Sequence, residues 1–162
     1  MNAFVNELTG GMPDATQLAR VLTRLVIAAL FGAIIGVQRE RAGKAAGLRT
    51  HMLVAMGGAL FVVSGAESGM TPEDLSRVIQ GLITGIGFIG AGAILKLPEE
   101  RYIGGLTTAA GIWMTAAVGV AAGLGRWGSA AASVVLTWII LAGLLRFEKQ
   151  LVKNLPENGG RA

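Results

Sequence analysis

The stretch VIQGLITGIGFIGAGAIL at residues 78–95 decides the fold, because it has no charged residue and is as long as a membrane span. A helix needs about 20 mostly apolar residues, at about 1.5 Å each, to cross the ~30 Å hydrocarbon layer of a bilayer. Gly81 and Gly85 are four residues apart, as are Gly87 and Ala91, so one face of this helix is nearly bare backbone. Small faces let helices approach closely in lipid. The pattern favours close helix packing; a helix unwound around a binding site is the alternative.

Four other runs of the chain share this apolar character. Hydrophobic residues make up 52% of the chain, charged residues 15%, and the mean hydropathy is +0.60, whereas a typical soluble domain is about 25% charged. The composition predicts an all-α integral membrane protein with five transmembrane helices and no soluble domain. The expected spans are Leu22–Gln38, Thr50–Ala66, Val78–Leu95, Ile103–Leu124 and Gly128–Leu145, flanked by tails at 1–21 and 146–162.

The basic residues predict the direction of the helices. Ten lysines and arginines fall in the first loop, the third loop and the C-terminal tail, against four on the opposite side. Cytoplasmic loops of membrane proteins carry the excess of Lys and Arg. We therefore expect the N-terminal tail outside the cell and the C-terminal tail in the cytoplasm. The net charge of +4 is then explained by topology and attraction to membrane lipids, and not by nucleic-acid binding.

Residues 30–50 and 88–108 align without a gap, with five identities in twenty-one positions. Two interpretations stand: chance similarity between segments rich in Gly and Ala, or a parallel repeat in which helices 1–2 and 3–4 form equivalent hairpins. Helices 2 and 4 both begin with Gly-Leu-x-Thr, at 47–50 and 105–108. These segments are capped helix starts or, beside Arg39, Arg41 and Arg49, a binding place for an anion or a phosphate headgroup, and capping is favoured.

Acidic side chains are absent from the five expected spans. Because a dehydrated Mg²⁺ ion needs several oxygen ligands, usually carboxylates, the sequence argues against a Mg²⁺ transporter that acts alone. The chain has no cysteine, no phosphate-binding loop and no nucleophile–base pair, so we expect no enzymatic activity, cofactor or metal. His51 stands alone at a helix start, and packing or an interfacial position is expected for it, not metal binding.

Four segments in order resemble the MgtC/SapB family of bacterial inner-membrane proteins. They are GVQRE at 36–40, AGLRT at 46–50, GIGFIGAG at 85–92 and GLTTAA at 105–110, and the resemblance covers residues 20–145. It implies a multi-pass inner-membrane protein linked to growth under Mg²⁺ limitation and, in pathogens, to virulence. It also implies action by binding other membrane proteins, the ATP synthase among them.

Two departures from the family pattern are visible. Many relatives carry a soluble C-terminal domain, whereas this sequence matches a short form that ends soon after its last span. The family pattern has a Glu at the position of Gln38, so the role of that acid is either in doubt here or taken over by Glu40.

The leading hypothesis is a non-enzymatic regulatory protein that acts through helix–helix contact, with a homo-oligomer permitted by its small-residue faces. The alternative is a small transporter or channel for an ion, Mg²⁺ included, or for a polar solute.

The candidate functional residues lie at the cytoplasmic rim and on the third and fourth helices. The polar groups expected to lie within the bundle are Gln80, Thr84, Thr107 and Thr108. The candidates are Gln38, Arg39, Glu40, Gly47, Arg49, Thr50, Gln80, Gly85, Gly87, Gly90, Gly92, Thr107 and Thr108.

Overall fold

The computed structural model describes residues 14–96 and 103–144 of the 162-residue chain. Its helices are α2 (Ala15–Arg41), α3 (Leu48–Glu67), α4 (Pro72–Gly92), α5 (Leu106–Gly123) and α6 (Trp127–Ile139), which continues into a π-helical turn, η1 (Ile140–Leu144). The two-residue strands β1 (Leu95–Lys96) and β2 (Ile103–Gly104) pair antiparallel between α4 and α5. Helices α2 to α5 are each long and apolar enough to cross a membrane, and α6 is a shorter apolar helix. The predicted all-α membrane fold with five helices is thereby confirmed.

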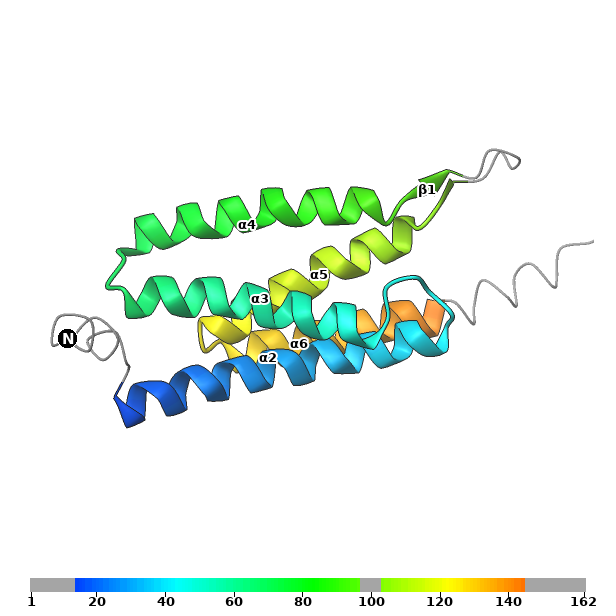
Figure 1. The fold of residues 1–162 in the computed structure, drawn as a ribbon. Coiled ribbons are helices and arrows are strands. Elements are labelled where there is room, and N and C mark those ends of the chain that lie inside the picture. Colours follow the sequence, from blue (N-terminus) through cyan, green and yellow to red (C-terminus); the bar gives the residue numbers. More distant parts are fainter. Residues whose placement is uncertain (1–13, 97–102, 145–162) are drawn as a thin grey trace, which may run out of the picture.

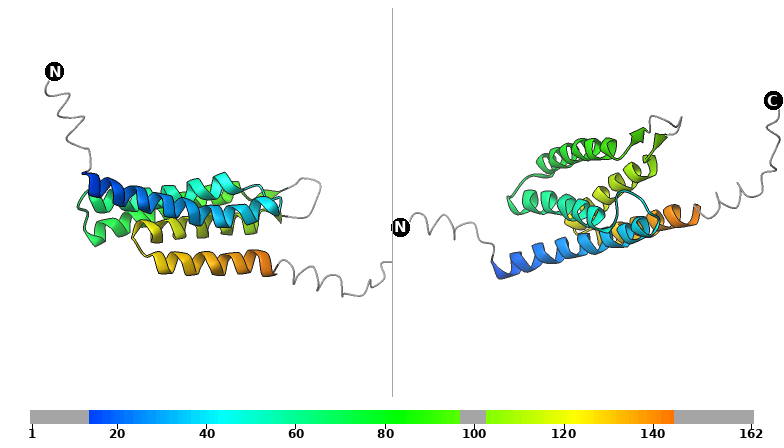
Figure 2. Two further views of the ribbon diagram at one scale, coloured as in Figure 1. Left: turned by 90° about the horizontal axis from the view of Figure 1, so that it is seen from below. Right: turned by 45° about the vertical axis from the view of Figure 1, so that its right-hand side comes forward.

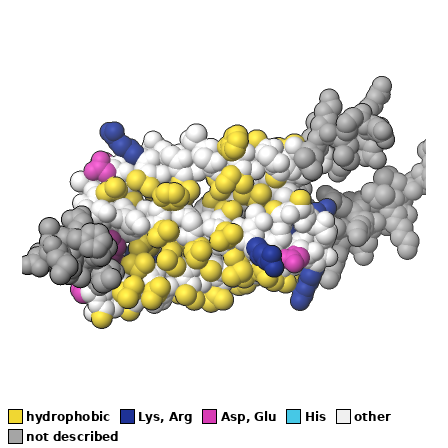
Figure 3. Space-filling view, viewed as in Figure 1, with side chains coloured by type: hydrophobic (Ala, Val, Ile, Leu, Met, Phe, Trp, Pro, Cys, Tyr) yellow, Lys and Arg dark blue, Asp and Glu magenta, His cyan; other side chains and the backbone are white. Residues whose placement is uncertain are grey.

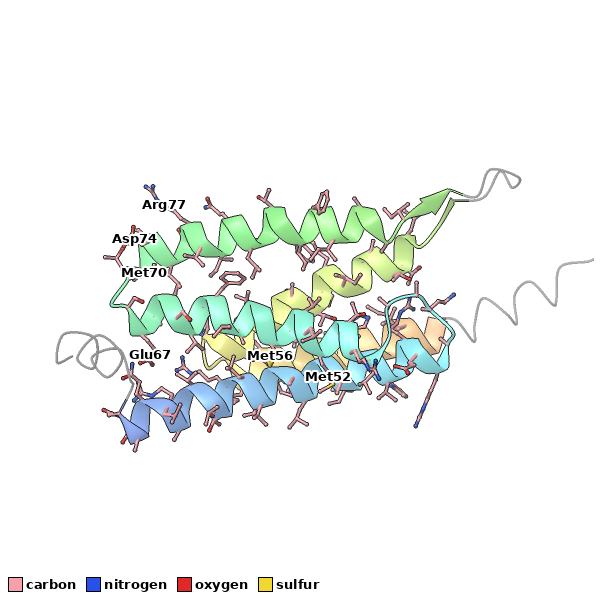
Figure 4. All side chains as sticks on the ribbon, in the orientation of Figure 1. Met52, Met56, Glu67, Met70, Asp74 and Arg77 are labelled. Atoms are coloured by element: carbon pink, nitrogen blue, oxygen red, sulfur yellow. The ribbon has the colours of Figure 1, made fainter. Side chains whose placement is uncertain are left out.

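Successive helices run in opposite directions, so their connections alternate between two ends of the bundle (Figure 1). The α2–α3 loop, the β1–β2 pair and the end of η1 lie at one end, which we call the loop-1 end. The other end holds the α3–α4 turn, where Figure 4 labels Glu67 and Asp74, and Glu67 also pairs there with Arg20 (Nη1 to Oε1, 3.8 Å). In the described part of the chain, the basic residues of the first loop lie at the loop-1 end, and Arg20 and Arg77 lie at the other end, as the predicted orientation requires. That the loop-1 end faces the cytoplasm stays a prediction.

Helix α2 is longer than the span expected at Leu22–Gln38. It begins at Ala15, because the side chain of Asp14 accepts a hydrogen bond from the backbone N–H of Gln17 (2.6 Å) and caps the helix. Such a cap satisfies one of the backbone donors that a helix start leaves free. Residues 15–21, expected in the N-terminal tail, are therefore helical, and residues 1–13 lie outside the described part of the chain.

Helix α4 is shifted from the expected Val78–Leu95. Thr71 caps its start by accepting from the N–H of Asp74 (3.2 Å), and Pro72 occupies the first position, where a missing N–H costs nothing. The helix ends at Gly92, and its last turn tightens as Ile94 N–H bonds to the carbonyl of Ala91 (3.1 Å). The chain then enters the β1–β2 pair.

Helix α5 begins at Leu106, later than the expected Ile103. Its N-cap, Gly105, has φ +91°, a left-handed conformation that favours glycine. A Cβ at Gly105 would also overlap the carbonyl oxygen of Ala93. The tail expected at 146–162 lies outside the described residues.

Helices α2, α3 and α5 pack against one another and form the core (Figures 1 and 2). Their glycines are the reason for the close approach. A Cβ added to Gly36 would lie 2.7 Å from the Cα of Leu48, and one added to Gly123 would lie 2.7 Å from the carbonyl oxygen of Ala59. The backbones of neighbouring helices are therefore in direct contact, which is how helices associate in lipid without a hydrophobic driving force between them.

Helix α6 packs on α5 and α2, whereas α4 packs on α5 and, to a smaller extent, on α3. Figure 2 shows α4 at the edge of the bundle, across α3 and α5 from α2. In Figure 3 hydrophobic side chains cover the middle of the molecule, and the charged side chains drawn there lie toward its two ends. This distribution is typical of a protein whose middle part is surrounded by the hydrocarbon of a bilayer.

Candidate functional site

Four polar side chains from three helices are buried at the loop-1 end of the core. Arg39 of α2 and His51 of α3 are both 0% exposed, and Thr108 and Thr115 of α5 are 4% and 0% exposed. We call these four residues the buried polar cluster. Ionisable groups inside a membrane domain are costly and commonly mark functional positions, so the cluster is a candidate site.

Arg39 is held by a single hydrogen bond. Its Nη2 donates to Oγ1 of Thr108 (3.0 Å), in the first turn of α5. Its Nε and Nη1 are buried and have no partner among the described residues. Within residues 14–96 and 103–144 the ion pair found is that of Arg20 with Glu67, at the other end of the bundle. The described part of the chain therefore offers Arg39 no carboxylate.

His51 is hydrogen-bonded to α5 through Nδ1, one of its two ring nitrogens. Nδ1 lies 2.7 Å from Oγ1 of Thr115, which also lies 2.8 Å from the carbonyl oxygen of Gly111. The single hydroxyl proton of Thr115 can go to either acceptor, so the tautomer of the ring decides whether Thr115 or His51 donates. Nε2 is buried and has no side-chain partner among the described residues.

Two glycines create the space for the imidazole ring. A Cβ on Gly36 would lie 3.1 Å from Cβ of His51, and one on Gly111 would lie 3.6 Å from its Cε1. Arg39 follows Gly36 by three residues and Thr108 precedes Gly111 by three, so the Arg39–Thr108 pair lies about 4.5 Å nearer the loop-1 end.

Two side chains next to Arg39 connect α2 to other helices by hydrogen bonds. Glu40 accepts a hydrogen bond at Oε2 from the backbone N–H of Leu48 (2.8 Å), at the start of α3. Gln38 donates from Nε2 to the carbonyl oxygen of Leu141 in η1 (3.1 Å). The Glu expected at position 38 could not make this bond, because a carboxylate has no N–H to donate.

The rim at the loop-1 end contains an open pocket of about 460 Å³. Both signs of charge line it, since Lys44, Arg49 and Glu40 are among its residues. The full lining is Glu40, Lys44, Ala45, Gly47, Leu48, Arg49 and Thr50.

The structure brings some predicted site residues together and separates others. Arg39 and Thr108 meet in the interior, and Glu40, Gly47, Arg49 and Thr50 share the rim pocket. The expectation that Gln80, Thr84 and Thr107 point into the bundle is wrong, since all three are exposed. Gln80 and Thr84 lie on the side of α4 away from α5, and Thr84 bonds only to its own helix, at the carbonyl of Gln80.

Sequence reasoning missed the role of Thr115 and left His51 without a partner. The signal was the spacing on helix α5, where Thr108, Gly111 and Thr115 fall at intervals of three and four residues and so share one helix face. A glycine between two threonines leaves a gap on that face, and His51 fills it.

Four of the five glycines of α4 pack against none of the described residues, contrary to the expectation for residues 78–95. A Cβ added at Gly81, Gly85, Gly87 or Gly92 would meet no atom within 4 Å, and only Gly90 packs, at 3.7 Å from Cβ of Ala109. Helix α4 is nonetheless continuous, so it is not unwound around a site. An apolar groove of about 500 Å³ runs beside these glycines. Its lining is Phe61, Val78, Gly81, Leu82, Gly85, Ile86 and Ile89.

The long apolar helices make the chain a multi-pass membrane protein. Comparison with known proteins identifies its family. The model of the MgtC family matches residues 25–150. The chain is 44% identical to protein SrpB of Synechococcus elongatus over 137 residues, which cover 78% of this chain and 75% of SrpB. It is also 39% identical to protein MgtC of Salmonella typhimurium over 146 residues, 90% of this chain and 61% of that protein. The chain belongs to the MgtC family.

A third relative carries a functional description in its name. The chain is 42% identical over 133 residues to YhiD of Escherichia coli, named as a candidate magnesium transporter, covering 76% of this chain and 60% of YhiD. The match thus spans about three fifths of YhiD and of the Salmonella MgtC protein. No solved structure matches the chain.

Proposed function

We propose that this chain is a non-enzymatic regulatory protein of the bacterial inner membrane that binds other membrane proteins through the exposed face of α4. The proposal rests first on membership of the MgtC family. The observation that carries the mode of action is the set of glycines on α4, Gly81, Gly85, Gly87 and Gly92, at which an added Cβ would meet no atom of the described residues within 4 Å. A bare helix face toward lipid gains no packing energy by itself, but it allows another helix to approach at backbone distance.

The position of α4 suits such a role. It contacts the core on one side only, through α5 and part of α3, and Phe61 of α3 borders the groove beside Gly81 and Gly85. A transmembrane helix with its own small-residue face fits this groove. The membrane ATP synthase is the first partner to test, a second copy of this chain is another, and growth in low Mg²⁺ is the physiological setting that we propose.

The chain has no cysteine, so a single introduced cysteine is the one thiol of the chain that can react with a cross-linker. Gly85→Cys on α4 is compared with Val26→Cys on α2, whose side chain is 55% exposed away from α4. In native membranes treated with a thiol-reactive cross-linker, Gly85→Cys should give discrete adducts identifiable by mass spectrometry, and Val26→Cys should not. Equal adduct formation at both positions, or none at Gly85→Cys, would contradict the proposal.

A second candidate function, transport of a polar solute or an ion, is favoured by the buried polar cluster. Polar and ionisable residues within a membrane domain mark many solute pathways. The positive charge of Arg39 inside the bundle argues against a bare Mg²⁺ ion as the solute. Flux of a solute through proteoliposomes that is lost with Thr108→Val would favour transport over regulation, whereas absence of flux together with cross-linking at α4 would favour regulation.

A further inference from the structure

The rim pocket at the loop-1 end is large enough for a small ligand, and charged groups of both signs line it. Its volume of about 460 Å³ falls within the roughly 300–1,000 Å³ of small-molecule sites in proteins. Lys44 and Arg49 supply two cations, Glu40 supplies a carboxylate, and Thr50 adds a hydroxyl. In Figure 3 basic and acidic side chains lie together at this end of the molecule. A ligand complementary to this lining carries a negative and a positive group at once.

The carboxylate of Glu40 is held in position at this pocket. Its Oε2 accepts a hydrogen bond from the backbone N–H of Leu48 (2.8 Å). Gly47 leaves room for the carboxylate, since a Cβ at this glycine would lie 2.8 Å from the same oxygen. Within residues 14–96 and 103–144, no salt bridge joins Glu40 to Lys44 or to Arg49. The charges of opposite sign in the lining are therefore not paired with each other, and each can bind a ligand group.

The face of α3 that continues from Arg49 away from the pocket is apolar and exposed. Leu53 follows Arg49 by four residues, so the two share one helix face, and Leu53 is 62% exposed. One turn further, a Cβ added at Gly57 would meet no atom within 4 Å, and Leu60 is again exposed. A molecule with its polar group in the pocket can therefore extend a hydrocarbon chain along α3. This arrangement favours a phospholipid over a soluble ligand.

We propose that the rim pocket binds the headgroup of a phospholipid whose phosphate ester carries a primary ammonium group, as in phosphatidylethanolamine. The phosphate accepts hydrogen bonds from Lys44 and Arg49, and the ammonium group donates to Glu40. Phosphatidylglycerol has the phosphate but no ammonium group. Phosphatidylcholine keeps the positive charge, but its quaternary nitrogen has no N–H to donate. The pocket therefore prefers phosphatidylethanolamine to both, and this proposal is independent of the docking role of α4.

The first experiment uses the unaltered full-length protein in a neutral detergent. Phosphatidylethanolamine, phosphatidylglycerol and phosphatidylcholine with identical acyl chains are titrated into the micelles in turn, and the thermal unfolding midpoint is followed. Phosphatidylethanolamine should raise the midpoint in a saturable manner, because a ligand that binds only the folded state stabilises it. The other two lipids should need an about tenfold higher mole fraction, because each lacks one hydrogen bond between charged groups. Equal effects of the three lipids, a stronger effect of phosphatidylglycerol, or no effect of phosphatidylethanolamine would overturn the proposal.

Variants then assign the two halves of the site. Glu40→Gln keeps an oxygen that can accept from the N–H of Leu48 but loses the negative charge, so it should bind phosphatidylethanolamine and phosphatidylglycerol equally. Arg49→Gln should weaken binding of phosphatidylethanolamine by about tenfold. Arg41→Gln removes the same charge from an exposed residue outside the pocket lining, and it should bind as the unaltered protein does. A preference retained by Glu40→Gln, or equal binding by Arg49→Gln and Arg41→Gln, would overturn the assignment. If Arg49→Gln does not fold, Lys44→Gln takes its place in this comparison.

A parallel titration tests whether the ligand is a lipid or a soluble phosphate ester. Glycerophosphoethanolamine has the same phosphate and ammonium groups as phosphatidylethanolamine but no acyl chains. Stabilisation by the lipid at concentrations where glycerophosphoethanolamine has no effect would support the proposal, because the exposed face at Leu53 and Leu60 then contributes to binding. Equal stabilisation by the two compounds at the same concentration would overturn the assignment to a lipid.

Discussion

The glycines of the α2–α3–α5 core and those of α4 have the same sequence spacing but opposite surroundings. In the core, a Cβ on Gly119 would overlap the carbonyl oxygen of Ala55, and one on Gly36 would lie 2.7 Å from Leu48. On α4, Gly81 and Gly85 meet nothing within 4 Å. Four-residue spacing of small residues therefore predicts that a helix can be approached closely, but it does not tell which helix approaches it. The core glycines pack against neighbouring helices, whereas four of the five glycines of α4 meet none of the described residues, which is the basis for proposing that a partner docks there.

The largest effect that separates the two sets is expected for Gly119→Leu. The new side chain would overlap the backbone of Ala55 in α3, and backbone cannot move aside as a flexible side chain can. We expect a loss of several kcal/mol, beyond the usual ~1–3 kcal/mol for overpacking, and little folded protein in detergent by size-exclusion chromatography. Gly87→Leu on α4 is the matched control and should accumulate normally. An equal decrease in the yield of folded Gly119→Leu and Gly87→Leu protein would show that Gly87 has a packing contact that is absent from the structure.

A smaller loss is expected for Thr115→Val, which tests the polar side of the core. The substitution keeps the shape of the side chain but removes the hydroxyl that is hydrogen-bonded to Nδ1 of His51. Leaving a buried polar atom unsatisfied costs about 1–3 kcal/mol. The free energy of unfolding, measured by denaturant titration in mixed micelles, should fall by this amount. Thr84→Val, on the exposed face of α4, should change it by less than about 0.5 kcal/mol.

Gly58→Ala should show a modest effect within the core. A single Cβ there would lie 3.0 Å from the carbonyl oxygen of Ala116, so α3 and α5 must separate slightly. A cost of about 1 kcal/mol follows, visible as a small decrease of the unfolding midpoint. Gly57→Ala on the next position of α3 meets nothing within 4 Å and serves as control. An equal decrease in both would mean that the contact between α3 and α5 is not the cause.

The smallest effect on stability is expected for Gly85→Leu, where the effect on function should be large. The added side chain enters the open groove beside Phe61, so unfolding of the isolated protein should change by less than about 0.5 kcal/mol. Under the proposed function, a partner helix would lose its close approach to α4, so growth in low Mg²⁺ should be impaired at normal protein levels. Normal growth with this variant would argue that α4 faces only lipid.

The sequence predicted the helices well because hydropathy and charge are properties of continuous segments. It was less accurate at the helix ends, where single residues act. Asp14 and Thr71 extend α2 and α4 by capping them, and Gly105 delays α5 until Leu106. The candidate site was only partly predictable for the same reason. Arg39 and Thr108 were both proposed, but their contact joins residues 69 positions apart.

The sequence by itself determined the five apolar helices, the two segregated sets of basic residues and membership of the family, because each is recorded in the order of residues along the chain. Only the tertiary structure decided which glycines bury against a neighbour, that Gln80 and Thr84 lie outside the bundle, and that Arg39 is buried beside His51. The physical reason is that every helix here has several apolar or small faces suited to contact. Which face is used depends on how closely two backbones can approach, and that depends on residues from both helices at once.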